Sequence, residues 1–222
     1  MEYRATETVI LNYDEFLLMM AAAGVSGWYG IELGEARDNF EDQAALNRHM
    51  AELYRKGLID WGENKAKIAE DIRPLFRVLR HAPVCIICSG RGGPETTSAS
   101  YCFDGEVVMI EKSLTGEKDL KLTFMKTDEW ISWFEQGGYF PKVAEPPEKA
   151  DADKQVLTED DRISAFEIRR IPDGKLIETV EFYDAGLYGV IVSTGSKSAS
   201  REMFRAEAAR AMIYRWAGGN AI

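Results

Sequence analysis

Residues Ala99–Lys112, with the sequence ASYCFDGEVVMIEK, contain two mainly apolar runs, the first with aromatic and the second with aliphatic and β-branched side chains, separated by Asp104-Gly105. An Asp-Gly pair between two such runs is a strong signal for a tight β-hairpin turn. The neighbouring segments Pro83–Ser89 and Asp119–Met125 have a similar apolar composition and predict two further strands. Because strands joined by short turns pair antiparallel, this stretch predicts an antiparallel or mixed sheet.

Helical patterns precede this sheet. A short predicted strand, Thr8–Asn12, leads into a helix over Glu15–Ala23, for which Asp14 is the expected N-cap. Apolar residues at helical spacing predict a second helix within Phe40–Lys56 and a third over Ala66–Arg80. Within the third, Pro74 must either kink the helix or start a new one. The N-terminal part is therefore rich in helices.

The C-terminal part repeats the strand pattern. A helix is predicted over Asp128–Gln136, and Pro141–Asp161, rich in Pro, Ala and charged residues, predicts an exposed linker. A final helix is predicted over Ala199–Ala217, with Ser198 as its cap. Between linker and helix, three further strands are expected at Ile163–Ile171, Lys175–Asp184 and Leu187–Ser193.

A weak internal repeat links the two parts. Tyr13-Asp14-Glu15-Phe16 and Thr127-Asp128-Glu129-Trp130 each follow a short strand, open a helix and are succeeded by three strands. This order predicts one α+β unit, 1–222, built from a helix-rich first half, 1–114, and a second half, 115–222. The expected fold is a central sheet flanked by helical bundles with a pseudo-two-fold axis.

Composition disfavours several classes of partner. The net charge is −10, which opposes binding to phosphate backbones and to anionic membrane surfaces. The N-terminus lacks a signal-peptide pattern, and no apolar run is long enough to span a membrane. Three cysteines, two of them in one apolar run, suit a reducing compartment. These observations predict a cytoplasmic protein.

Catalytic and cofactor motifs are incomplete. Cys85 and Cys88 have the spacing of a redox pair, but they lie in a strand-like run rather than at a helix N-terminus. Neither His49 nor His81 has a neighbouring group that would activate it as a base, and no His/Cys cluster has zinc spacing. The glycine-rich loop Ser89–Pro94 does not lead into a helix, as a phosphate loop must. We therefore expect no enzyme activity, metal or cofactor.

The segment Leu53–Arg80 allows two interpretations. A helix that ends at Lys56-Gly57 before a turn is similar to the recognition helix and wing of a winged-helix DNA-binding regulator. Such a helix would read bases and phosphates through residues such as Asn47 and Arg48. Acidic residues share the helix, however, and the chain as a whole is acidic.

Three short motifs follow one another before the sheet. They are Asp14-Glu15 at the start of the first helix, the helix end Leu53–Ile59, and the spaced apolar residues Ile72, Leu75 and Leu79 before Pro83. In these motifs, of which the second has the form Leu-x-x-(Arg/Lys)-Gly-Leu-(Ile/Val), and in its order of elements the chain resembles the EspG family of type VII (ESX) secretion-associated chaperones. The resemblance implies a non-catalytic cytosolic chaperone that binds a protein, such as a small helical secretion substrate; a homodimer is compatible with it.

A chaperone without nucleotide or metal must act by covering apolar surface, so its binding face should expose a large apolar patch. The ribbon Lys175–Ser193 is the best candidate, because it carries several aromatic and β-branched side chains. The expected partner-binding residues are Val180, Phe182, Tyr183 and Tyr188. The alternative is that helices cover both faces of the sheet and that these side chains belong to the core.

Overall fold

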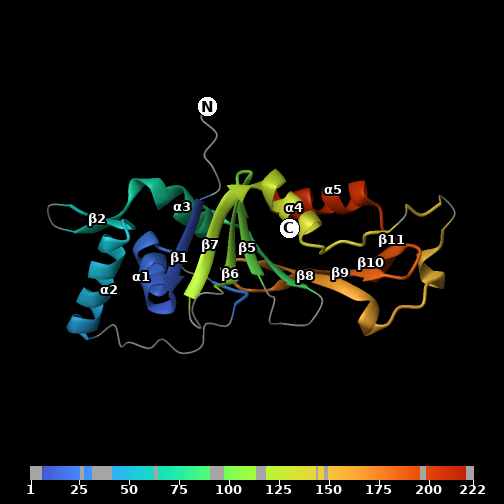
Figure 1. Cartoon of the computed structure of the whole chain (residues 1–222), viewed down its shortest axis with the longest axis horizontal. Coiled ribbons are helices and arrows are strands. Elements are labelled where there is room, and N and C mark those ends of the chain that lie inside the picture. Colours follow the sequence, from blue (N-terminus) through green and yellow to red (C-terminus); the bar gives the residue numbers. More distant parts are fainter. Residues whose placement is uncertain are drawn as a thin grey trace.

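The computed structural model describes residues 7–25, 28–31, 42–62, 65–90, 98–113, 119–143, 145–147, 150–195 and 199–218. A long antiparallel sheet runs through the molecule, and helices pack against it (Figure 1). Its nine strands lie in the order β1-β7-β6-β5-β4-β8-β9-β10-β11. They are β1 Glu7–Asn12, β4 Val84–Gly90, β5 Ser98–Phe103, β6 Glu106–Lys112, β7 Asp119–Lys126, β8 Arg162–Arg170, β9 Leu176–Asp184, β10 Gly189–Gly195 and β11 Ala199–Met203.

Five α-helices are described. They are α1 Tyr13–Ala23, α2 Gln43–Arg55, α3 Arg73–His81, α4 Thr127–Gln136 and α5 Ala206–Ala217. The expected α+β class and antiparallel sheet are confirmed. The predicted turn at Asp104-Gly105 is also confirmed, since both residues have positive φ and join β5 to β6.

The helices divide between the two faces of the sheet. In Figure 1, α1–α3 gather at one end, beside β1 and β7, whereas α4 and α5 lie at the upper right, on the side of β8–β11. Alternation along β4 shows the division: Cys85 belongs to the core under α1–α3, while Val84 and Ile86 belong to the core under α4 and α5. The sheet therefore separates two hydrophobic cores, one on each of its faces.

One helix start differs from the sequence-based expectation, and another decides between the two alternatives given for Pro74. The N-cap of α1 is Asn12, not Asp14, because the Asn12 side chain accepts a hydrogen bond from the Glu15 amide at 2.9 Å. The Glu15 carboxylate in turn accepts a hydrogen bond from the Asn12 amide at 3.0 Å. Pro74 lies in the first turn of α3, where its missing N–H costs nothing, so it starts that helix. The predicted cap Ser198 lies outside the described residues.

Two segments predicted as helix are strands. Ala66–Ile68 forms β3 and pairs with β2, Ile59–Trp61, in a separate two-stranded hairpin. Ala199–Met203 forms β11, the edge strand of the large sheet, and pairs with β10. Both are short edge segments, where pairing with an existing strand overrides the weak local preference of three to five residues.

The order of strands bears on the predicted duplication. Outward from the central β4–β8 pair, the triplets β4-β5-β6 and β8-β9-β10 follow the same order on opposite sides. The fourth strands, β7 and β11, continue this order, but the outer edge of β7 pairs with β1, whereas no described strand pairs with the outer edge of β11. Duplication of halves 1–114 and 115–222 therefore stays a hypothesis.

The predicted linker, 141–161, connects α4 to β8 along the β11 side of the sheet (Figure 1). Much of its described length is exposed, and Val156 is 85% exposed. Pro141, Pro146 and Ala152 are nevertheless buried, and the Arg201 guanidinium donates to the Gln155 carbonyl at 3.0 Å. The segment is thus attached to β11.

Candidate partner-binding site

The second half of the sheet has one face that the described helices leave open. Whereas α1–α3 pack on β1, β5, β6 and β7, the core that includes α4 and α5 lies on the other face and takes side chains from β4–β7 and also from β8, β9 and β10. Along the open face of β8–β10 the side chains are half-buried. They include Glu167, Thr179, Glu181, Tyr183 and Val192.

This open face is polar and internally paired. Arg162 contacts Glu181 at 3.0 Å, and Arg169 contacts Glu167 at 2.6 Å. The Tyr183 hydroxyl donates a hydrogen bond to Glu181 at 3.0 Å. The pKa of Tyr183 is raised to about 12, mainly by burial and secondly by the Glu181 carboxylate. The expected large apolar patch on this ribbon is therefore absent from the described residues, which offer hydrogen-bonding groups instead.

Two of the four predicted binding residues face the core. Val180 and Phe182 are fully buried. The Phe182 ring centroid lies 5.0 Å from that of Phe140 and 5.6 Å from that of Phe166. Because strand side chains alternate, burying these two positions under α5 directs their neighbours to the open face. A folded chain cannot present Val180 or Phe182 to a partner.

Tyr183 and Tyr188 are the other two predicted residues, and both are half-buried. Tyr183 lies on the open face, and Tyr188 lies in the β9–β10 turn, where its carbonyl accepts from the Ala185 amide at 3.0 Å. Leu187, in the same turn, is 77% exposed. Binding at this ribbon stays a prediction, now for Tyr183 and Tyr188.

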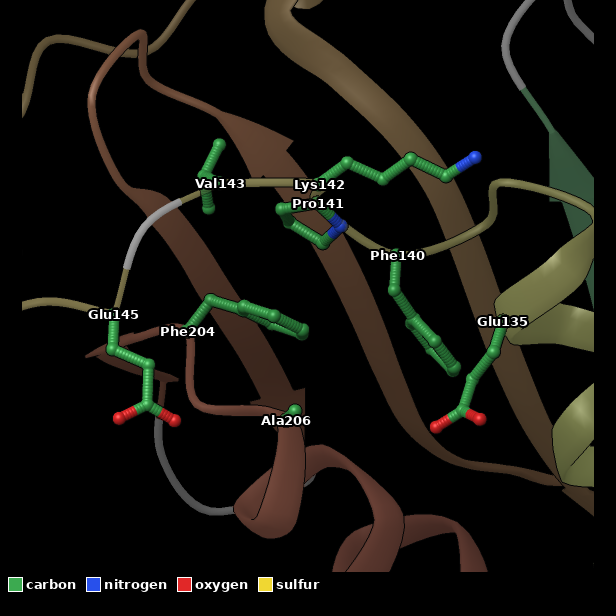
Figure 2. A pocket seen from close by; sticks show the side chains of 8 residues that line it. All are labelled: Glu135, Phe140, Pro141, Lys142, Val143, Glu145, Phe204 and Ala206. Carbon is green, nitrogen blue, oxygen red and sulfur yellow. The ribbon is translucent and has the colours of Figure 1, made fainter.

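A small pocket adjoins that turn. Its volume is about 210 Å³, and it lies between the residues that follow α4 and the start of α5. In Figure 2 the Phe140 and Phe204 rings approach the space from two sides, with Ala206 below and Pro141 and Val143 above. The lining is mainly apolar.

Gly189 is the reason that these segments can meet. A Cβ atom on this residue would lie 2.7 Å from Pro141 and 2.9 Å from the Phe204 Cβ. The Phe204 amide also donates to the Gly189 carbonyl at 2.8 Å, which fixes the chain just before α5. The sequence alone does not predict this pocket: it has Phe140-Pro141 after a helix end and a glycine that opens a strand, but no local pattern brings them together.

We expect Gly189→Ala to lower the free energy of unfolding by about 1–3 kcal/mol, because Pro141 and Phe204 must move to admit the methyl group. Thermal or urea unfolding measures the effect. Thr194→Ala, at an exposed position of the same strand, is the control and should change stability by less than about 0.5 kcal/mol. Equal stability of the two variants would show that Pro141 does not pack on β10.

The charged groups at the pocket differ in their partners. Glu135 is held by Arg210, whose guanidinium donates at 2.8 Å. Glu145 is exposed and makes no hydrogen bond or ion pair with the described residues. In Figure 2 the Lys142 side chain extends away from the space between the two rings. The pocket therefore has an apolar interior, and at its edge the carboxylate of Glu145 and the ammonium of Lys142 are not paired with described residues.

Two basic side chains at the C-terminal end of the helix proposed to read DNA are paired with carboxylates of the protein. Arg55 contacts Glu52 at 2.5 Å, and the Lys56 ammonium lies 2.6 Å from Glu15, which is only 1% exposed. The β2–β3 hairpin does follow α2, as a wing would, and Trp61 on it is 58% exposed. The hairpin matches the winged-helix interpretation, but the pairing of the basic groups opposes it.

The candidate catalytic groups occupy structural positions. Cys85, Cys88 and Cys102 are buried in the sheet, and burial raises the pKa of each thiol, that of Cys85 to about 12. The His81 ring lies 5.4 Å from that of Phe103. Among the described residues, no group of three His, Cys, Asp or Glu side chains could hold a metal. No helix in the described part of the chain is long and apolar enough to cross a membrane.

Comparison with known proteins gives a likeness in fold. No protein-family model matches the sequence, and no curated protein matches it. Among solved structures, the chain is similar to the Mycobacterium tuberculosis type VII secretion system chaperone EspG5, solved in complex with a PE25–PPE41 dimer. The TM-score is 0.55 at 11% identity, over 94% of this chain and 95% of that one. The two proteins share an EspG-like fold.

Proposed function

We propose that the protein is a non-catalytic chaperone or adaptor that binds another protein, of the kind that serves type VII secretion. The likeness in fold to a chaperone solved with a protein dimer bound, over nearly the full length of both chains, supports this proposal. The proposed partner is a small helical secretion substrate, held in the cytosol before export. The substrate class of the similar structure is not assumed for this chain.

The geometry suits such a role. A partner that lies across the open face of β8–β10 meets Tyr183, Glu181 and Arg162, whose side chains offer hydrogen bonds. The adjoining pocket between Phe140 and Phe204 offers apolar contact. Protein interfaces combine a small apolar centre with a polar rim in this way.

A winged-helix DNA-binding regulator is the second candidate, because the β2–β3 hairpin follows α2. It would need several free basic side chains on α2 to contact phosphates. Arg55 and Lys56 are instead paired with Glu52 and Glu15. The net charge of −10 adds a repulsive field. We therefore favour the chaperone.

One experiment separates the two functions. The chain is coexpressed with small helical proteins from its gene neighbourhood and analysed by size-exclusion chromatography, and a random-sequence DNA duplex is titrated in parallel at low and high salt. A stoichiometric protein complex and no DNA shift at either salt concentration are expected. Duplex binding with a steep inverse salt dependence, and no protein complex, would reverse the choice.

A further inference from the structure

We propose that the pocket between Phe140 and Phe204 is an anchor site for one large apolar side chain of a protein partner, presented beside a basic residue. This inference rests on the proposed function, because it takes the partner to be a protein. The inference adds the place where the partner's anchor side chain binds and the type of residue that is recognised beside it.

The size of the pocket selects its occupant. At about 210 Å³ it is smaller than the roughly 300–1,000 Å³ of sites that enclose drug-sized ligands and cofactors. A single Phe, Leu or Met side chain is of suitable size. Protein interfaces often derive most of their binding energy from a few such anchors, each enclosed in a desolvated pocket.

The walls of the pocket are held in place before a partner arrives. The Phe140 and Phe204 ring centroids lie 6.4 Å apart, and each ring also packs on buried Phe182, at 5.0 and 6.1 Å. Phe204 is further fixed by its backbone hydrogen bond to Gly189. A rigid pocket loses little conformational entropy on binding, so even one inserted side chain can contribute to affinity.

The charge at the edge of the pocket indicates which kind of residue should lie next to the anchor side chain in the partner. Of the charged side chains that line the pocket, Glu135 is held by Arg210, whereas Glu145 and Lys142 have no partner among the described residues, and Lys142 extends away from the space between the two rings. The carboxylate of Glu145 and the net charge of −10 both attract a cation. An amphipathic partner helix with a Lys or Arg one turn from its apolar anchor satisfies both features.

Defined peptides test the site without the natural partner. Three capped, alanine-rich helical peptides are titrated into isotopically labelled protein: one with a central Phe flanked by Lys one turn away, one with Ala for Phe, and one with Glu for Lys. We expect the first to shift the amide signals of Val143 and Ala206 most strongly. The Ala peptide should give no saturable shift there, and the Glu peptide should bind about two- to fivefold more weakly, the effect of one exposed ion pair.

Two matched variants locate the effect. Ala206→Phe places a ring in the pocket from its exposed position at the start of α5, and should abolish the shifts caused by the Phe peptide. Ala211→Phe, at an exposed position of the same helix that does not line the pocket, should leave them unchanged. Equal binding of the Phe and Ala peptides, or equal binding to the two variants, would overturn the proposal.

The same variants separate this inference from the proposed function. Once a natural partner forms a complex, Ala206→Phe should weaken it about 30-fold, as loss of a central anchor does, with an unchanged melting temperature. If the complex tolerates Ala206→Phe, the proposed chaperone function stands and the proposed anchor site is rejected. If the Phe peptide binds at Ala206 but the chain captures no secretion substrate, the anchor site stands and the proposed chaperone function is rejected.

Discussion

Replacing Phe182 with alanine is expected to lower the free energy of unfolding by about 3–5 kcal/mol, the cost of removing a fully buried phenylalanine. Phe182 is 0% exposed, and its ring contacts those of Phe140, Phe166 and Phe204. The surrounding strands cannot close the cavity without moving both walls of the pocket. At about 2–4 °C per kcal/mol, calorimetry should resolve the fall in melting temperature.

Tyr183→Ala is the matched control, because Tyr183 is the next residue of β9 and lies on the open face. Its loss removes one hydrogen bond to Glu181 and should cost about 1 kcal/mol. If the ribbon binds a partner, Tyr183→Ala should weaken that complex without a large change in melting temperature. A Phe182→Ala variant as stable as Tyr183→Ala would show that the Phe182 side chain is not packed in the core.

This pair of residues shows how far sequence could predict the site. The aromatic and β-branched composition of Lys175–Asp184 predicted a strand, with Phe182 and Tyr183 among its candidate binding residues. It could not say which face is covered, because the covering helix, α5, follows two strands later in the chain. A hydrophobic side chain near a candidate site is more often part of the core, as Val180 and Phe182 prove to be.

The central strands were predictable because their signals are local. Asp104-Gly105 specifies a hairpin by itself, and apolar runs such as Val84–Cys88 are long enough to be recognised. The edge strand Ala199–Met203 lacks both signals and pairs with β10 only in the folded chain. The pocket depends on contacts of Gly189 with Pro141 and Phe204, which are far apart in sequence, so no local pattern predicts it.

Replacing Lys56 with methionine should be nearly as destabilising as the loss of Phe182. The Lys56 ammonium lies 2.6 and 2.8 Å from the two carboxylate oxygens of Glu15, which is 1% exposed. Removing the cation leaves a buried carboxylate whose remaining described partner is the Asn12 amide. Breaking a buried ion pair costs about 3–5 kcal/mol, and we expect about 3 because the Lys56 side chain is 32% exposed and water can enter its place.

Two further variants identify the cause. Arg55→Met removes the neighbouring cation, whose ion pair with Glu52 is exposed, and should cost less than about 1 kcal/mol. Adding Glu15→Gln to Lys56→Met removes the uncompensated charge, so the double variant should be more stable than Lys56→Met alone in urea unfolding. If Lys56→Met instead behaves like Arg55→Met, Lys56 does not neutralise a buried charge and is free for a phosphate. In the structure Lys56 forms an ion pair with Glu15 of α1. A Lys56 side chain without that role would strengthen the DNA-binding interpretation of α2.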